Sequence, residues 1–298
     1  GGSDMMSPVK REPLDARLSA ALPETVDLRL VVTDMDGTLV DAESRLPAGL
    51  DDAVTEMREH GILFAPASGR QMANLRSVLG AAVEDSPLIA ENGSFVVHDG
   101  VEIHSATITP DEARAAITAA HRLAAEGRDL GAVVACKERA YTERDDAPFA
   151  AQIGIYYTAH QVVDDLLALP LDTVLKVAIF DFDNVEDGTA EAMRAAVPTV
   201  QTVVSGKHWV DLMSHGADKG RAVGAIQERL GITPAQTTVF GDYLNDLGLY
   251  DYSELSFAMA NAHPGIHEVA RYTAPANTED GVLRAVAALM ERLPADRA

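Results

Sequence analysis

The sequence predicts an α/β protein with a doubly wound, Rossmann-like parallel-sheet core and an inserted α+β cap domain. Three observations indicate this fold. Short apolar runs rich in Val and Ile alternate with helical patterns near both ends of the chain, as in a parallel sheet covered by helices. A long middle stretch carries antiparallel signals instead. Polar and acidic clusters directly follow the apolar runs, where open α/β sheets bind their ligands.

The first part of the predicted core has a βαβαβ order. Helices are recognised by apolar residues at helical spacing, and buried strands by short apolar runs between turn residues. We expect strands at residues 28–33, 62–67 and 87–90, with helices at 46–60 and 71–79 between them.

The pattern changes after Gly93. An Asp99-Gly100 pair between alternating apolar residues predicts a two-residue hairpin turn. Thr109 to Glu112 form a capping box with Pro110 at the first helical position, which opens a helix. The rest of the insert is expected to contain strands near 131–136, 174–180, 200–204 and 208–213 and helices near 161–169 and 189–196.

Parallel α/β signals resume in the last part of the chain. They predict helices at 219–230, 264–270 and 278–293 and strands at 237–240 and 255–259. We therefore expect a core of residues 27–100 and 208–298, interrupted by a cap at 101–207. Residues 1–26 are expected to be a largely disordered arm, with a cloning remnant at Gly1–Met6 and one helical turn near Ala16–Leu22.

Composition limits the class of partner. The chain has 298 residues, of which 47% are hydrophobic, and this is enough for a sizeable core. A net charge of -22 disfavours nucleic acid and anionic membrane surfaces, because both attract basic proteins. No apolar run reaches the roughly 20 residues of a membrane helix. The single cysteine, Cys136, excludes an internal disulfide, so we expect a cytoplasmic protein.

Two aspartates, Asp34 and Asp36, end the first apolar run. Their spacing places both side chains on one side of an extended chain, and Gly37 lets the chain turn there. A solvated hairpin turn is the alternative for this motif alone. An EF-hand loop does not fit, because Leu39 and Arg45 occupy its glycine and glutamate positions.

Three further positions could complete a site. Ser68 offers a hydroxyl and nearby backbone N–H groups to an anion, although a plain helix cap is the commoner role of such a serine. Lys219 opposes the dipole of the helix that it opens, and a bound phosphate would explain this. Asp242 would lie beside Asp34 if their strands are neighbours, although an acidic surface turn is the alternative. Together these groups could bind a hard cation and a phosphoryl group.

In this order, DMDGT, ASGR, the later lysine and GDYLND resemble the four motifs of the haloacid dehalogenase (HAD) superfamily. The insert is similar to the cap of its Cof-type (type IIB) sugar phosphatase branch. The resemblance runs from about Leu28 to Leu293 and includes Glu91-Asn92-Gly93. Ser68 stands where threonine is commoner, and Met35 between the aspartates is a second small departure.

The resemblance implies a Mg²⁺-dependent phosphatase of small phosphorylated metabolites, above all sugar phosphates, that works through an aspartyl-phosphate. Asp34 would be the nucleophile and Asp36 the general acid and base. Mg²⁺ would be bound by Asp34, the backbone carbonyl of Asp36 and Asp242, with Asp246 ordering its surroundings. The implied phosphate-binding residues are Met35, Ser68, Gly69, Lys219 and Asn245, and Arg70 could reach the leaving group.

The insert is expected to set substrate specificity. Lys176, inside an otherwise apolar strand, is the best single candidate for a substrate contact, although a satisfied core residue is the commoner role for any such side chain. Two other functions stay open. A phosphomutase would return the phosphoryl group to its substrate, and a regulatory module would bind a phosphate ester without turnover.

Overall fold

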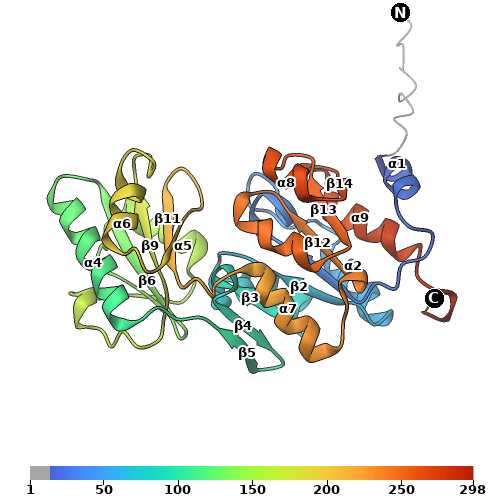
Figure 1. The fold of residues 1–298 in the computed structure, drawn as a ribbon, viewed down its shortest axis with the longest axis horizontal. Coiled ribbons are helices and arrows are strands. Elements are labelled where there is room, and N and C mark those ends of the chain that lie inside the picture. The colour runs from blue at the N-terminus through green and yellow to red at the C-terminus, as the bar shows by residue number, and fades with distance from the viewer. Residues whose placement is uncertain (1–13, 298) are drawn as a thin grey trace, which may run out of the picture. The chain divides into compact units, whose positions relative to one another are not determined.

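The computed structural model describes residues 14–297 (Figure 1). The predicted cloning remnant and the first half of the predicted arm lie outside these residues. The chain divides into two compact units: one combines the stretch up to Phe64 with the stretch from Arg229 onward, and the other is Ala65–Glu228. The core and cap boundaries at 100/101 and 207/208 stay a prediction.

The first unit is built on a sheet with the strand order β14-β13-β12-β1-β2. β1 pairs in parallel with β12, β12 with β13, and β13 with β14. From β1 the chain continues to β2 on one side, whereas β12 leads to β14 on the other, so the order reverses between β1 and β12 and the predicted doubly wound core is confirmed. The strands are β1 (Leu30–Thr33), β2 (Leu63–Pro66), β12 (Thr237–Gly241), β13 (Leu255–Met259) and β14 (Tyr272–Ala274).

Helices cover this sheet with apolar stripes. In α2 (Leu50–Glu59) the buried residues Leu50, Val54 and Met57 recur at helical spacing, with two acidic residues in the first turn and Arg58 in the last, as the helix dipole favours. The other helices of this unit are α1 (Leu14–Ala21), α8 (Pro264–Val269) and α9 (Gly281–Met290), while α7 (Lys219–Leu230) crosses from the second unit into it.

The predicted disorder of the N-terminal arm does not extend over residues 14–26. The helical turn expected near Ala16–Leu22 is a longer helix, α1, and Leu18 and Leu22 are buried. The backbone N–H of Val26 donates to the carbonyl of Arg292 (2.8 Å). Apolar burial and this hydrogen bond hold the segment on the first unit, which composition alone did not indicate.

The second unit contains a largely antiparallel sheet with the order β10-β11-β9-β6-β7-β8. Alternate residues of its central strands point to opposite faces. Val134, Val177 and Ile179 belong to the core that contains residues of α4 and α6, whereas Val133 and Ala178 pack with residues of α5. The elements are α4 (Pro110–Ala125), β6 (Leu130–Cys136), β7 (Ala140–Thr142), α5 (Ala147–Tyr156), β8 (His160–Val162), β9 (Val174–Asp181), α6 (Thr189–Ala196), β10 (Gln201–Val204) and β11 (Trp209–Met213).

A small antiparallel sheet, β3-β4-β5, lies in the same unit. Its β4–β5 turn has positive φ angles at Asp99 and Gly100 (51° and 73°), as a two-residue hairpin turn of this type requires, so the predicted hairpin is confirmed. The elements here are α3 (Met72–Leu79), β3 (Leu88–Ala90), β4 (Phe95–His98) and β5 (Val101–Ser105).

The helix predicted at 161–169 is wrong. The exposed strand β8 and a short helical turn at Leu166–Ala168 occupy that stretch, because β8 pairs in parallel with β7 at the sheet edge. Helix α5 was not predicted. Its start signal was present, since Asp146 caps the helix by accepting from the N–H of Phe149 and a proline follows in the first turn.

The N-cap residue of helix α5, Asp146, allows a prediction of how protein stability depends on pH. Arg144 donates two hydrogen bonds to the Asp146 carboxylate (2.9 Å each), and these lower the pKa of Asp146 from 3.8 to about 2. A carboxyl group whose pKa is lower in the folded protein than in the unfolded chain stabilises the fold at pH values above the unfolded pKa. This stabilisation is lost as the pH falls through the pKa of the folded protein. We therefore expect the Tm advantage of the native protein over Asp146→Asn to shrink between pH 3.8 and about 2.

Thermal melts followed by circular dichroism across this range measure the effect. Asp145→Asn is the matched control, because it removes the same charge from the exposed neighbour of Asp146. Equal pH dependence for the two variants would contradict the assignment.

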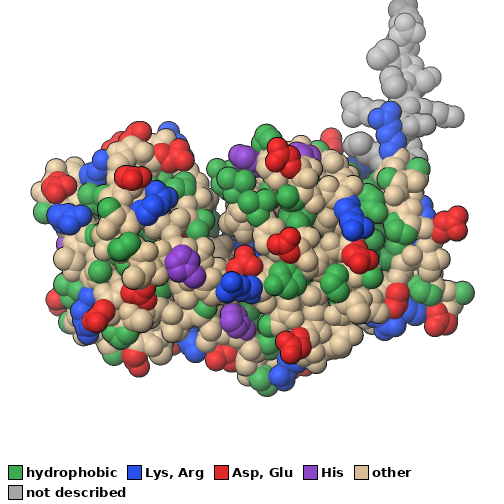
Figure 2. All heavy atoms as spheres, in the orientation of Figure 1, with side chains coloured by type: hydrophobic (Ala, Val, Ile, Leu, Met, Phe, Trp, Pro, Cys, Tyr) green, Lys and Arg blue, Asp and Glu red, His purple; other side chains and the backbone are tan. Residues whose placement is uncertain are grey.

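The surface agrees with the acidic composition. On the face drawn in Figure 2, Asp and Glu side chains are spread out, with Lys, Arg and His scattered among them. Between residues 14 and 297, no helix combines the length and the apolarity that a membrane span needs.

Candidate active site

Asp34 follows β1 directly, at the point where the strand order reverses. Its backbone N–H donates to the carbonyl of Phe240 (3.1 Å), which extends the β1–β12 pairing by one residue. The chain then turns tightly over Met35–Leu39, and Asp34 Oδ1 accepts a hydrogen bond from the N–H of Met35 (2.7 Å). The side chain of Met35 is fully buried, so its backbone is what it can offer to a ligand. Asp36 in the same turn is half-buried.

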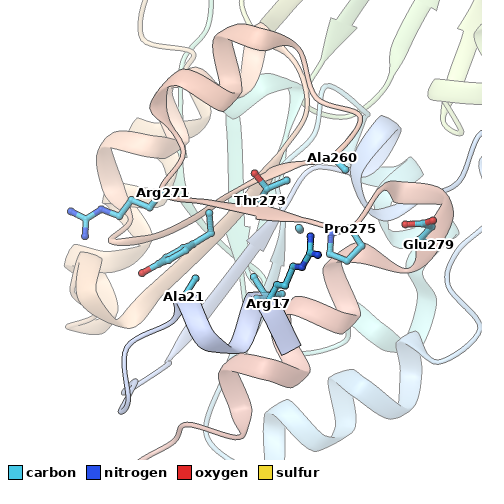
Figure 3. A pocket seen from close by; sticks show the side chains of 10 residues that line it. Arg17, Ala21, Ala260, Arg271, Thr273, Pro275 and Glu279 are labelled. Carbon is cyan, nitrogen blue, oxygen red and sulfur yellow. The ribbon is translucent and has the colours of Figure 1, made fainter. Parts of the chain in front are cut away.

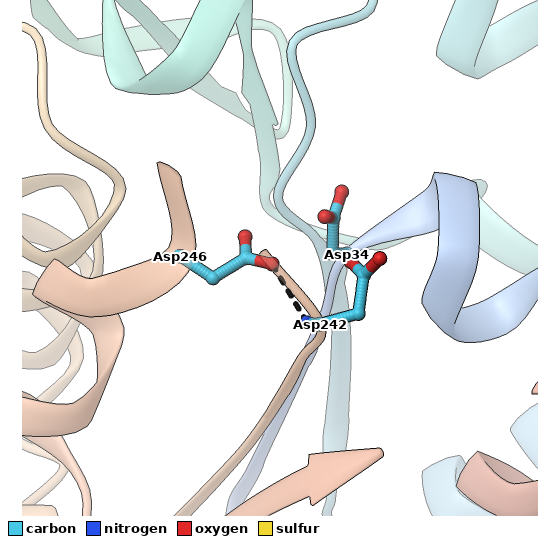
Figure 4. A group of neighbouring side chains, drawn as sticks. All are labelled: Asp34, Asp242 and Asp246. Atoms are coloured by element: carbon cyan, nitrogen blue, oxygen red, sulfur yellow. Dashed lines mark hydrogen bonds between the residues drawn. The ribbon is translucent and has the colours of Figure 1, made fainter. Parts of the chain in front are cut away.

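Asp242 follows β12 just as Asp34 follows β1. Thr38 donates its hydroxyl proton to Asp242 Oδ1 (3.1 Å). Oδ2 of Asp246 accepts hydrogen bonds from the backbone N–H groups of Asp242 (3.0 Å) and Tyr243 (3.3 Å), and Figure 4 shows the Asp246 side chain reaching toward the backbone of Asp242. Asp246 therefore fixes the acidic loop in which Asp242 lies.

Three carboxylates converge at this place. Asp34, Asp242 and Asp246 each offer one oxygen, and these oxygens lie within 4.8 Å of one another (Figure 4). Asp34 and Asp246 are buried. Like charges so close together repel unless a cation or a proton compensates them, and an all-oxygen donor set suits Mg²⁺. The residues present therefore fit this metal, and Asp246 contributes an oxygen to the same cluster.

The field of the cluster reaches a neighbouring phenol. Burial, with further contributions from the carboxylates of Asp246, Asp242 and Asp34, raises the pKa of Tyr250 above its usual value. The hydroxyl of Tyr250 donates to the carbonyl of Phe257 (2.6 Å). Tyr250 is thus held neutral beside a strongly negative site.

Gly37 permits the close approach of the first aspartate motif to Asp242. Its φ of +75° lies in the left-handed region, and a Cβ atom there would lie 2.0 Å from Asp242 Oδ2. The carbonyl of Gly37 accepts from the side-chain amide of Asn261 (2.9 Å). Both the backbone conformation and the available space therefore require glycine at this position.

The other predicted residues, except Asn245, belong to the second unit. Ser68 comes after β2, and its hydroxyl oxygen accepts from the backbone N–H of Arg70 (2.9 Å). The cap of α3 is Gln71, so the plain N-cap alternative for Ser68 is wrong. Arg70 is buried, donates to Asn74 Oδ1 (3.1 Å), and has its guanidinium over the ring of Tyr156.

A turn at Glu91–Gly93 joins the Ser68 loop to the start of α7. The N–H of Asn92 donates to the carbonyl of Ser68 (2.9 Å). Gly93 has a φ of +93°, and a Cβ there would lie 2.4 Å from the carbonyl oxygen of Asp218, next to Lys219. Lys219 itself is 1% exposed. Sequence reasoning gave this turn no role, although the residues Glu91-Asn92-Gly93 were part of the resemblance.

The structure thus gathers Asp34, Asp242 and Asp246 in the first unit, with Asp36 on the adjoining turn. Asn245 is half-buried in the same unit, in the helical turn Leu244–Tyr252. Ser68, Gly69, Arg70, Lys176 and Lys219 all belong to the second unit.

A separate cavity of about 320 Å³ lies between α1 and β14 (Figure 3). Arg17 of α1 and Tyr272 and Thr273 of β14 are among its lining residues. None of the three clustered carboxylates lines it. It is therefore distinct from the acidic site.

The fold and the acidic site define a class of proteins. The profile of the haloacid dehalogenase-like hydrolases matches residues 31–286, and the chain belongs to this family.

Individual relatives are similar over most of the chain. It is 28% identical over 262 residues to the 5-amino-6-(5-phospho-D-ribitylamino)uracil phosphatase YbjI of Escherichia coli K12, covering 87% of this chain and 94% of that protein. A haloacid dehalogenase-like hydrolase from Bacteroides thetaiotaomicron has a similar structure (TM-score 0.78, 20% identity, 87% and 98% of the two chains). So does the HAD subclass IIB sugar phosphatase BT4131 (TM-score 0.73, 19% identity, 87% and 98%). At these identities the two structures support the fold alone.

Proposed function

We propose that this protein is a Mg²⁺-dependent phosphatase that hydrolyses small phosphorylated metabolites, sugar phosphates above all, through an aspartyl-phosphate on Asp34. The observation that carries the proposal is the position of Asp34, buried at the carboxyl end of β1 with oxygens of Asp242 and Asp246 beside it. A relative named as a phosphatase of a phosphoribitylamino compound supports the substrate class.

The proposed reaction has two displacements. A carboxylate oxygen of Asp34 attacks phosphorus, the bond from phosphorus to the ester oxygen breaks, and Asp36 gives its proton to that oxygen. A water molecule then attacks the phosphorus of the aspartyl-phosphate while Asp36 takes its proton. The bond between phosphorus and Asp34 breaks, which releases inorganic phosphate and restores both carboxyl groups.

Asp34, Asp242, the backbone carbonyl of Asp36 and Asp246 would hold or order Mg²⁺. When bound, the metal neutralises the crowded carboxylates and offsets the charge of the phosphoryl oxygens. The Ser68 hydroxyl, the N–H groups of Gly69 and Met35, and the side chains of Lys219 and Asn245 are proposed to bind those oxygens, where charge changes most during transfer. The side chain of Arg70 is proposed to contact the leaving group.

The direct test is phosphate release from a panel of sugar phosphates and a generic aryl phosphate. The proposal expects metal-dependent release from at least one sugar phosphate. Formation of an isomerised sugar phosphate without free phosphate would show that the protein is a mutase and not a phosphatase. Tight binding of an ester with neither product formed would show that the protein is a binding module without turnover.

Metal removal gives a further prediction. Dialysis against EDTA is expected to lower phosphate release by about 100-fold or more, because three unneutralised carboxylates would repel an anionic substrate. Added Mg²⁺ should restore the activity, and it should also raise Tm, since a cation that binds only the folded state stabilises it. Full activity after exhaustive chelation would overturn the metal assignment.

A further inference from the structure

A buried charged cluster in the second unit connects β9 and β11 to the Ser68 loop. Lys176 lies on β9 and is 3% exposed. Its Nζ donates to the backbone carbonyl of Gly69 (2.8 Å) and lies 3.3 Å from Oε2 of Glu91, with the Tyr157 ring 5.6 Å away. We propose that Lys176 is a positioning residue for the loop Ser68–Arg70, with Glu91 and Asp211 holding its ammonium group in place. This inference rests on the proposed function, in which the loop binds phosphate.

The sheet places these charges together. Lys176 pairs with Met213 of β11, and Asp211 lies two residues from Met213, so Lys176 and Asp211 share one face of the sheet. Asp211 also accepts a hydrogen bond from the side-chain amide of Asn92 (3.3 Å). The cluster therefore holds the Glu91–Gly93 turn through the side chains of two of its residues.

The three charged groups of the cluster depend on one another. Burial disfavours the ammonium form of Lys176, but the carboxylates of Asp211 and Glu91 outweigh this and raise the pKa of Lys176 above its usual value. Burial also raises the pKa of Glu91, and both of its carboxyl oxygens lack a hydrogen-bond partner within residues 14–297. An uncompensated buried charge is strongly destabilising, so the ion pair with Lys176 is what Glu91 relies on.

All three carbonyl groups of the loop are occupied. The carbonyl of Ser68 accepts from the N–H of Asn92 (2.9 Å), that of Gly69 from Lys176, and that of Arg70 from the N–H of Glu91 (3.0 Å). Two of these donors belong to the turn that the cluster fixes, and the third is the cluster lysine. The cluster thus contributes to the orientation of all three carbonyl groups.

One peptide plane connects Lys176 to the proposed phosphate ligand. A trans peptide is planar, and its C=O and N–H point in opposite directions. With the carbonyl of Gly69 directed to Lys176, the N–H of Arg70 points the other way and donates to the hydroxyl oxygen of Ser68 (2.9 Å). The Ser68 oxygen is used as an acceptor there, which leaves its proton for a phosphoryl oxygen. By the same argument, the bond from Asn92 to the Ser68 carbonyl orients the N–H of Gly69.

This geometry differs from the substrate contact expected from the sequence. A substrate contact would affect only substrates that carry the contacted group. A positioning residue acts on the phosphate subsite and affects all phosphate esters alike.

The first experiment compares Lys176→Met with the native protein. We expect kcat to fall about 10- to 100-fold, because one charge-assisted hydrogen bond that acts on a shared phosphate subsite is lost. The factor should be similar for a generic aryl phosphate and for sugar phosphates. A loss confined to sugar phosphates would overturn the proposal in favour of substrate contact. Lys137→Met is the matched control, since Lys137 is a partly exposed lysine paired with Glu102 in the same unit.

Two further variants separate positioning from folding. Adding Glu91→Gln and Asp211→Asn to Lys176→Met removes the uncompensated carboxylates, and should restore Tm without restoring kcat. In a Ser68→Ala background, Lys176→Met should cost much less than in the native background, because both changes act on the same hydroxyl. Restored kcat in the triple variant, or fully additive losses, would overturn the proposal.

Hydrogen exchange tests the inference without reference to catalysis. In Lys176→Met, amide exchange of a peptide covering residues 68–70 should accelerate at least about tenfold, while the β4–β5 hairpin keeps its native rate. Unchanged exchange in the loop would overturn the positioning role whether or not the protein is a phosphatase. Faster exchange in a protein that releases no phosphate from any ester would instead reject the proposed function alone.

Discussion

Asp34→Asn is expected to lower phosphate release by about 10⁴-fold or more, the size of effect seen when a covalent nucleophile is removed. The amide oxygen cannot replace the carboxylate as a nucleophile. The fold should persist, because the backbone bond from Asp34 to Phe240 does not involve the side chain and an asparagine Oδ1 can still accept from the N–H of Met35. Tm should stay the same or rise, since one of three repelling carboxylates is removed.

The measurement is kcat on the best substrate of the panel, with Tm as the check on folding. Asp51→Asn removes the same charge from an exposed position on α2 and should leave kcat unchanged. If Asp34→Asn kept more than about a tenth of the native kcat while Mg²⁺ dependence remained, Asp34 would not be the nucleophile.

Gly37→Ala is expected to impair the metal site, although Gly37 has no side chain that could bind the metal. The new methyl group would lie 2.0 Å from Asp242 Oδ2, so the carboxylate must move and its bond from Thr38 is lost. Displaced ligands of this kind weaken metal affinity by about 10- to 100-fold. We expect the Mg²⁺ concentration for half-maximal activity to rise by that factor, with a lower kcat at saturation.

Gly100→Ala separates this effect from backbone strain. Gly100 has nearly the same φ (+73°), but no atom lies within 4 Å of a Cβ built there. An alanine in the left-handed region costs roughly 1–2 kcal/mol at either position. Both variants should therefore lose stability, and only Gly37→Ala should alter the Mg²⁺ response. An unchanged Mg²⁺ titration for Gly37→Ala would contradict the close packing around Asp242.

The sequence could predict that Asp34 and Asp242 lie close together, because both residues follow strand ends. Asp34 and Asp242 each follow an apolar run, and parallel neighbours bring such positions together at one edge of a sheet. The place of Asp246 was harder to predict. Its carboxylate accepts from two backbone N–H groups of its own loop, which depends on the folded path of that loop.

Local sequence patterns could not predict the buried charged cluster of the second unit. Glu91, Lys176 and Asp211 come from three separate segments, and a lysine in an apolar strand gives no indication of its partner. The misread helix at 161–169 has a related cause. Its leucines have helical spacing, but pairing with β7 decided the conformation of its first residues.

The hydrogen bonds of Gln71 and Asn74, at the start of α3, bear on how segments could be exchanged between relatives. Gln71 exchanges two bonds with the backbone of Ala159 (2.7 and 3.0 Å), and Asn74 donates to Ile155 and Thr158. A chimera that transplanted residues 101–207 from a relative would replace one partner of each of these bonds and of the Lys176 contacts. A graft that carries the Ser68–Asn74 segment and the Glu91–Gly93 turn together with residues 101–207 would keep donor and acceptor from the same parent.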